Sequence, residues 1–281
     1  MRRVLPFALL IPSGLFLALF AAALALLLTY SFRAYTSLVM EPVFTLDTWS
    51  HFLTSSFYWS IVWETIELAL IVTAVTVVLA YPTAWVLVQI PNRFVLVACY
   101  IVLFSPLLVS VVVRSYGWLL LLGDQGFVNA QLTRLPWIHE PVRLVFNSTG
   151  VTIALIHILL PFAMFPLLSV LRQMPRNVRE AAADLGAPPW LVFLRVSLPL
   201  SLPGVITGAQ IVFTLAVSAW VTTVLLGGGR VLVLAKLVLD NISDLNLPLG
   251  SVESFVLFVI ALTALTIFSR LNRAIYAGRE A

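Results

Sequence analysis

The sequence predicts an all-α polytopic membrane protein with six transmembrane helices, and three observations carry this prediction. Of its 281 residues, 61% are hydrophobic and only 10% are charged. The mean hydropathy is +1.07. Apolar runs recur along the chain, each near or above the roughly 20 residues that cross a bilayer as a helix. Such a composition excludes an ordinary soluble domain.

The first half of the chain predicts three spans. The apolar run 4–30 is too long for the hydrophobic region of a signal peptide, so we expect it to be span 1. Polar residues as far as Tyr58 predict an outer loop. Spans 2 and 3 are expected at 59–90 and 94–122, separated by a short turn that contains Pro91.

The second half repeats this pattern after a second outer loop at 123–148. Span 4 is expected at 150–171, span 5 at 198–226 and span 6 at 252–268, with a third outer loop at 230–251. Pro161 and Pro166 should bend span 4, which membrane helices tolerate where neighbours satisfy the freed carbonyl groups. We expect one transmembrane domain over 1–281, with a polar loop at 174–197 between spans 4 and 5.

The basic residues predict the orientation. Their tightest clusters, Arg172 to Arg195 and Arg270 to Arg279, directly flank predicted spans, and Lys and Arg are enriched on cytoplasmic flanks. We therefore expect both termini and the 174–197 loop on the cytoplasmic side. Topology also explains the pI of 9.6, so no nucleic-acid partner is expected.

The sequence offers no motif for catalysis or for cofactor binding. A P-loop needs Gly-Lys-Ser/Thr, whereas the only lysine, Lys236, lies between Ala235 and Leu237. The single cysteine, Cys99, excludes an intrachain disulfide and a Cys-based metal site. We expect a chain that is not an enzyme and holds no cofactor or metal ion of its own.

The 174–197 loop, which we name the docking segment, predicts two short helices with a bend. Pro175 suits a first helical turn, Gly186 suits the left-handed position after a helix end, and Pro188 and Pro189 open a second helix. Small apolar residues recur at i, i+3, i+4 and i+7, at Val178, Ala181, Ala182 and Leu185. Charged side chains on another face can fix a partner's register through charge-assisted hydrogen bonds. The pattern is typical of a docking helix.

Residues at fixed spacing in the docking segment resemble the signature of ABC-importer permeases. Glu180-Ala181-Ala182, Gly186 and Val196-Ser197-Leu198-Pro199 match it, with valine where isoleucine is usual. The resemblance implies the type I permease fold and a loop that inserts into a cytoplasmic ATPase subunit. It assigns the ATPase contact to Glu180, Ala181, Ala182, Asp184, Leu185, Gly186, Trp190 and Pro199.

The resemblance also implies a complex in the bacterial cytoplasmic (inner) membrane. Its other members would be two copies of the ATPase subunit, which bind ATP and Mg, a second similar permease, and an extracytoplasmic binding protein. A self-sufficient secondary transporter is the alternative. That class predicts ionisable groups at mid-depth and broken helices in matched halves. The predicted spans are nearly free of such ionisable groups.

Two groups of residues in spans 2 and 3 are candidates for the translocation path. Glu64 and Glu67 share one helix face, where they either attract a cation or lie at the interface within reach of water. Arg114 lies about 30 Å along a straight span 3, which places it near the outer interface. There it would act as an interfacial anchor. The segment 106–118 also resembles a run of polyamine-type permeases, and this resemblance implies instead that Arg114, Tyr116 and Trp118 line the outer gate.

Span 5 supplies two further path candidates, Trp220 and Thr222, whose side chains also suit packing. Parts of the chain, including 160–167 and 225–228, resemble the spermidine/putrescine permease subfamily, in which span 5 often carries two acids. Ala219 and Val224 stand in the places of those acids. A polyamine is therefore the first substrate hypothesis, and opine-like, amino-phosphonate, iron and sulfur-oxyanion substrates remain open.

Overall fold

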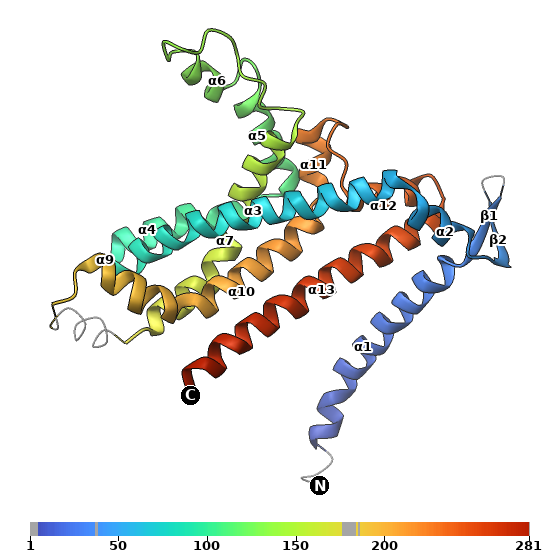
Figure 1. Cartoon of the computed structure of the whole chain (residues 1–281), viewed down its shortest axis with the longest axis horizontal. Helices are drawn as coiled ribbons and strands as arrows, with labels where there is room; N and C mark the ends of the chain where they lie inside the picture. Colours follow the sequence, from blue (N-terminus) through green and yellow to red (C-terminus); the bar gives the residue numbers. More distant parts are fainter. Residues whose placement is uncertain (1–4, 37–38, 176–183, 185, 281) are drawn as a thin grey trace. The chain divides into compact units, whose positions relative to one another are not determined.

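The structure, a computed structural model, describes residues 5–36, 39–175, 184 and 186–280. Helices dominate it (Figure 1). In the described part of the chain, five helices are long and apolar enough to cross a membrane, or six if one bent pair counts as a single span. The chain divides into two compact units, Met1–Val62 with Leu234–Val259, and Trp63–Val233 with Ile260–Ala281.

The first unit contains structure that the sequence did not predict. The expected outer loop after α1 (Leu5–Tyr30) forms an antiparallel hairpin, β1 (Arg33–Thr36) and β2 (Val39–Phe44), and then helix α2 (Asp47–Thr54). Phe32 stacks on Phe44 and on Trp49, with ring centroids 5.3 and 6.0 Å apart. Trp49 Nε1 also donates to Ser31 Oγ at 3.1 Å. These contacts hold the hairpin against the end of α1.

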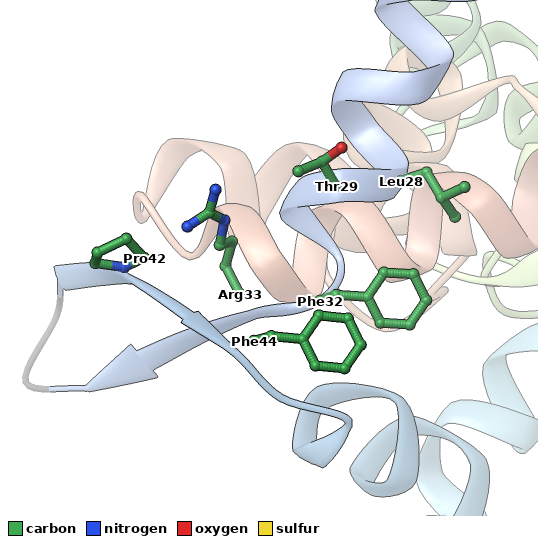
Figure 2. Close-up of a pocket in the computed structure, with 6 residues that line it drawn as sticks. All are labelled: Leu28, Thr29, Phe32, Arg33, Pro42 and Phe44. Atoms are coloured by element: carbon green, nitrogen blue, oxygen red, sulfur yellow. The ribbon is translucent and has the colours of Figure 1, made fainter.

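A cavity of about 400 Å³ lies beside this hairpin (Figure 2). Its lining is mostly apolar and includes one charged residue, Arg33, among Leu28, Thr29, Phe32, Arg33, Pro42 and Phe44. None of the residues that the sequence selected as site candidates lines it. The first unit is completed by α12 (Leu234–Ser243) and by the first turns of α3 (Ser56–Gln89) and α13 (Leu247–Glu280).

The second unit contains most of the long helices. After α3 come α4 (Arg93–Phe104), the 3₁₀ turn η1 (Ser105–Leu108), α5 (Val111–Leu122), α6 (Phe127–Leu132) and α7 (Ser148–Gln173). Then follow α9 (Pro189–Val192), η2 (Phe193–Ser197), α10 (Leu198–Val217), α11 (Trp220–Gly227) and the rest of α13. Asn92 and Asn147 cap α4 and α7. Their side chains accept hydrogen bonds from backbone N–H groups that have no partner within the helix.

The segment predicted as one straight span 3 is broken. Arg93–Leu108 and Val111–Leu132 are bent by 105° relative to each other. Pro106 has no N–H to donate to a regular helix and lies in the 3₁₀ turn. Ser110 then adopts φ −53° and ψ 141°, outside the helical region. The estimate that placed Arg114 about 30 Å along a straight helix is therefore wrong.

Helices α7 and α10 pack closely along each other in the second unit. A Cβ on Gly208 would lie 3.0 Å from the carbonyl oxygen of Ala163, and one on Gly204 would lie 3.1 Å from that of Pro166. Small residues one turn apart let two membrane helices approach in this way. Ala163 is fully buried at the contact.

Span 5 is also broken into two helices. α10 ends at Val217 and α11 begins at Trp220, so the predicted helix 198–226 is interrupted. Ala219 adopts φ −81° and ψ 78°, which is not helical. Gly228 follows α11 with φ +54°, and a Cβ there would lie 2.2 Å from the ring of Phe146. Both the backbone and the available space therefore require glycine at this helix end.

Candidate functional site

The described part of the docking segment confirms one feature of its predicted geometry. Gly186 has φ +81°, the left-handed conformation expected after a helix end. A Cβ at Gly186 would meet no atom within 4 Å. Asp184 is described and exposed. Four predicted contact residues lie outside the described residues: Glu180, Ala181, Ala182 and Leu185.

The second helix of the docking segment begins where the prolines predicted. Pro189 is the first residue of α9, and Pro188 before it is extended, with φ −65° and ψ 152°. Trp190 is 63% exposed. Pro199 lies in the first turn of α10. Contact of Trp190 and Pro199 with an ATPase subunit stays a prediction.

A cavity of about 240 Å³ lies at the break between α10 and α11. It brings together three of the path candidates, Arg114 from α5 and Trp220 and Thr222 from α11. The rest of the lining is mostly apolar: Val111, Leu155, Ile158, Leu159, Phe162, Leu215, Ser218, Ala219 and Val221. All these residues belong to the second unit.

Arg114 supplies the only charged side chain among the described residues that line this cavity. Its Nε and Nη1 atoms are buried and have no hydrogen-bond partner in the described part of the chain. Buried donors normally have partners, and an unpaired one costs ~1–3 kcal/mol. The guanidinium group is therefore able to bind an acceptor that another molecule supplies.

Two hydrogen bonds between side chains fix α5 beside the cavity. Ser115 Oγ and Thr222 Oγ1 lie 3.0 Å apart, and both residues are buried. Trp118 Nε1 donates to His157 Nδ1 at 3.1 Å, which links α5 to α7. Since Nδ1 accepts in this geometry, a neutral His157 carries its proton on Nε2. The helix that carries Arg114 is thus held from two sides.

The other path candidates are not part of the cavity lining. Glu64 and Glu67 are exposed on α3. Tyr116 is 51% exposed, and Trp118 contacts His157. A role for these residues in the path stays a prediction.

Glu253 is a buried ionisable group that was missing from the candidates. It lies near the start of α13 in the first unit and is fully buried. Asn241 of α12 places Nδ2 2.9 Å from each of its carboxyl oxygens. The sequence carried a usable signal for Glu253, because it is an acidic residue within the apolar run 252–268. Acidic residues are rare in membrane spans and pair there with other groups. The contact ties α12 to α13.

The fold and the site define a class of protein, a polytopic helical membrane protein with a cavity beside the break between two of its helices. A chain in the crystal structure of a bacterial alginate ABC transporter, solved with an alginate pentasaccharide-bound periplasmic protein, has the same fold. The TM-score is 0.81, with 98% of this chain and 96% of that chain covered and 16% sequence identity.

The sequence comparisons narrow this class to one family. The family model described as "Binding-protein-dependent transport system inner membrane component" matches residues 70–279, and the chain belongs to this family. The spermidine/putrescine transport system permease protein PotB of Escherichia coli (strain K12) is 31% identical over 237 residues, which cover 83% of this chain and 85% of the relative. The probable sulfate transport system permease protein cysT of Nephroselmis olivacea is 29% identical over 206 residues, covering 72% and 70%. The chain is a permease subunit of an ABC importer.

Proposed function

We propose that the chain forms half of the translocation path for a small solute, as one transmembrane domain over 1–281. Family membership carries this proposal. The cavity at the α10–α11 break supports it, because three path candidates from two helices, α5 and α11, meet there. A binding protein delivers the solute from the extracytoplasmic side, and a second, similar permease supplies the other half of the path.

The energy for transport comes from a partner in this proposal. Two copies of a cytoplasmic ATPase subunit bind ATP and Mg, and the docking segment contacts them. Both termini face the cytoplasm. The turn at Gly186 and the exposed Trp190 support this assignment, since together they offer a partner a bent backbone and a large apolar side chain.

The first candidate for the solute is a polyamine of the spermidine or putrescine type. It is supported by the relatives of that name, which align with most of this chain. The exposed carboxylates of Glu64 and Glu67 would favour a cation near α3.

One feature of the cavity favours a second candidate, an oxyanion such as sulfate. Arg114 has two unpaired buried nitrogens, and no carboxylate belongs to the described lining residues. Ala219 lines the cavity in the place where the polyamine subfamily often has an acid. A guanidinium group repels a polyamine and binds oxyanions through charge-assisted hydrogen bonds.

Stimulation of ATP hydrolysis distinguishes the two candidates. The complete complex is reconstituted in proteoliposomes and supplied with its binding protein and with spermidine, putrescine or sulfate in turn. A polyamine should stimulate hydrolysis if the first candidate is correct. Stimulation by sulfate alone, reduced about tenfold or more by Arg114→Gln as expected for one lost charged hydrogen bond, supports the second. If none of these three solutes stimulates hydrolysis, both candidate solutes are excluded.

A further inference from the structure

The docking segment enters the membrane helices through a short π-helical stretch. α9 continues into η2, which continues into α10 without an intervening loop. π-helical turns are rare and are found frequently at functional sites. Ser197, the last residue of η2, is fully buried, and its Oγ has no partner within the described residues.

Phe193, the first residue of η2, contacts two aromatic side chains of α3. Its ring centroid lies 5.7 Å from that of Tyr81 and 5.7 Å from that of Trp85, with interplanar angles of 84° and 87°. Tyr81 and Trp85 are one turn apart on α3, and their rings are nearly parallel at 6.4 Å. Edge-to-face contacts of this kind are the favoured geometry for aromatic pairs. We name these three residues the aromatic cluster.

A buried hydrogen bond joins the same face of α3 to the first turns of α10. Tyr81 Oη lies 2.8 Å from Ser201 Oγ, and both side chains are buried. Ser201 gives its hydroxyl proton to the carbonyl oxygen of Leu198 at 2.9 Å, so Tyr81 is the donor to Ser201. Tyr81 therefore contacts both Phe193 and Ser201.

The π-helical turn explains how Phe193 and Ser201 reach the same residue. In a regular α-helix, residues eight apart point about 80° away from each other around the axis. A π-turn accommodates one additional residue, so the same stretch behaves as about seven α-helical steps and ends within about 20° of its starting direction. The turn thus places both side chains on the face that meets α3.

We propose that Tyr81 and Phe193 are the positioning residues that make the docking segment and α3 move together. The proposal rests on the importer function proposed above. When a partner displaces the docking segment, α10 must follow because the helix is continuous, and α3 follows through the aromatic cluster and the Tyr81–Ser201 bond. Without these contacts, α10 would move past α3, and ATP hydrolysis would be less tightly linked to transport.

The test uses the full complex in proteoliposomes and measures three quantities for each variant: ATPase subunit retained on purification, ATP hydrolysed, and solute transported. Phe193→Ala should retain the ATPase subunit and hydrolyse ATP, but transport per ATP should fall about five- to tenfold from the loss of two aromatic contacts. Tyr81→Phe keeps the ring and loses the donor, so we expect about a two- to fivefold fall. Phe94→Ala is the matched control, since it is the same substitution at a residue of α4 that lies outside the docking segment and is 86% exposed.

A double-mutant cycle in thermal unfolding tests the contact independently of transport. Phe193→Ala and Tyr81→Ala should be non-additive in the melting temperature of the purified complex, because each removes the partner of the other. Additive effects, unchanged transport per ATP in Phe193→Ala, or loss of the ATPase subunit from that variant would each overturn the proposal. A wild-type complex whose hydrolysis does not respond to the loaded binding protein would refute the importer function, and the cycle would still report on the contact.

Discussion

Replacing Gly186 by alanine tests the geometry of the docking segment with a single methyl group. A Cβ at this position meets no atom within 4 Å, so the substitution creates no clash within the described residues. Among the described residues, the backbone angle φ of +81° is then the only source of strain. An L-residue in the left-handed region costs about 1–2 kcal/mol, which corresponds to a roughly five- to thirtyfold shift between two conformations. Gly186→Ala should therefore shift the docking segment toward a second conformation, in which α9 points away from its native direction.

The assay is the amount of ATPase subunit that co-purifies with the permease, together with ATP-driven uptake. We expect Gly186→Ala to lower both by about five- to thirtyfold, and Gly186→Asn to lower them less, because asparagine visits the left-handed region more readily. Gly14→Ala is the matched control, since a Cβ on Gly14 also meets no atom within 4 Å and its φ is not positive. In helix α1 this change should be neutral or slightly stabilising. Equal behaviour of the alanine variants at Gly186 and Gly14 would show that the reasoning is wrong.

Three other predictions follow from packing, burial and orientation. Gly208→Val should lower the melting temperature of the purified complex, because overpacking at a 3.0 Å contact with backbone costs roughly 1–3 kcal/mol; an unchanged melting temperature would refute close α7–α10 packing. Asn241→Leu should destabilise the protein by about 1–3 kcal/mol because it leaves Glu253 buried without its donor, and Asn241→Leu combined with Glu253→Gln should recover part of that loss in the same melting assay. In a cysteine-free background, single cysteines at Asn177 and at the exposed Asp244 should react with an impermeant thiol reagent from opposite sides of the membrane; reaction of both from one side would contradict the predicted orientation.

Helix positions could be predicted from the sequence because the bilayer requires long apolar runs. The breaks in spans 3 and 5 could not be predicted, because hydropathy carries no information about where the backbone changes direction. Proline alone does not locate a break either. Pro82 and Pro161 lie inside continuous helices, whereas Pro106 coincides with a bend of 105°. The difference depends on which neighbours can satisfy the freed carbonyl groups, and that is a property of the folded chain.

The sequence predicted three residues of the cavity one by one, but not the cavity itself. Arg114 was selected from the resemblance of its segment, and Trp220 and Thr222 by residue type and depth. They line one cavity beside the breaks that precede α5 and α11. The docking segment was more predictable, since the left-handed turn at Gly186 and the start of a helix at Pro189 follow from local backbone preferences. The π-helical turn that places Phe193 has no comparable sequence signal.

Uptake of solute into proteoliposomes that hold the complete complex tests the central claim most directly. The binding protein and the solute are placed on one side of the membrane, and ATP with Mg on the other. An importer permease predicts uptake that requires both the loaded binding protein and hydrolysable ATP, and that stops when a non-hydrolysable analogue replaces ATP. Uptake that continues without ATP and follows an imposed ion gradient would contradict the claim, because the chain would then be a secondary transporter.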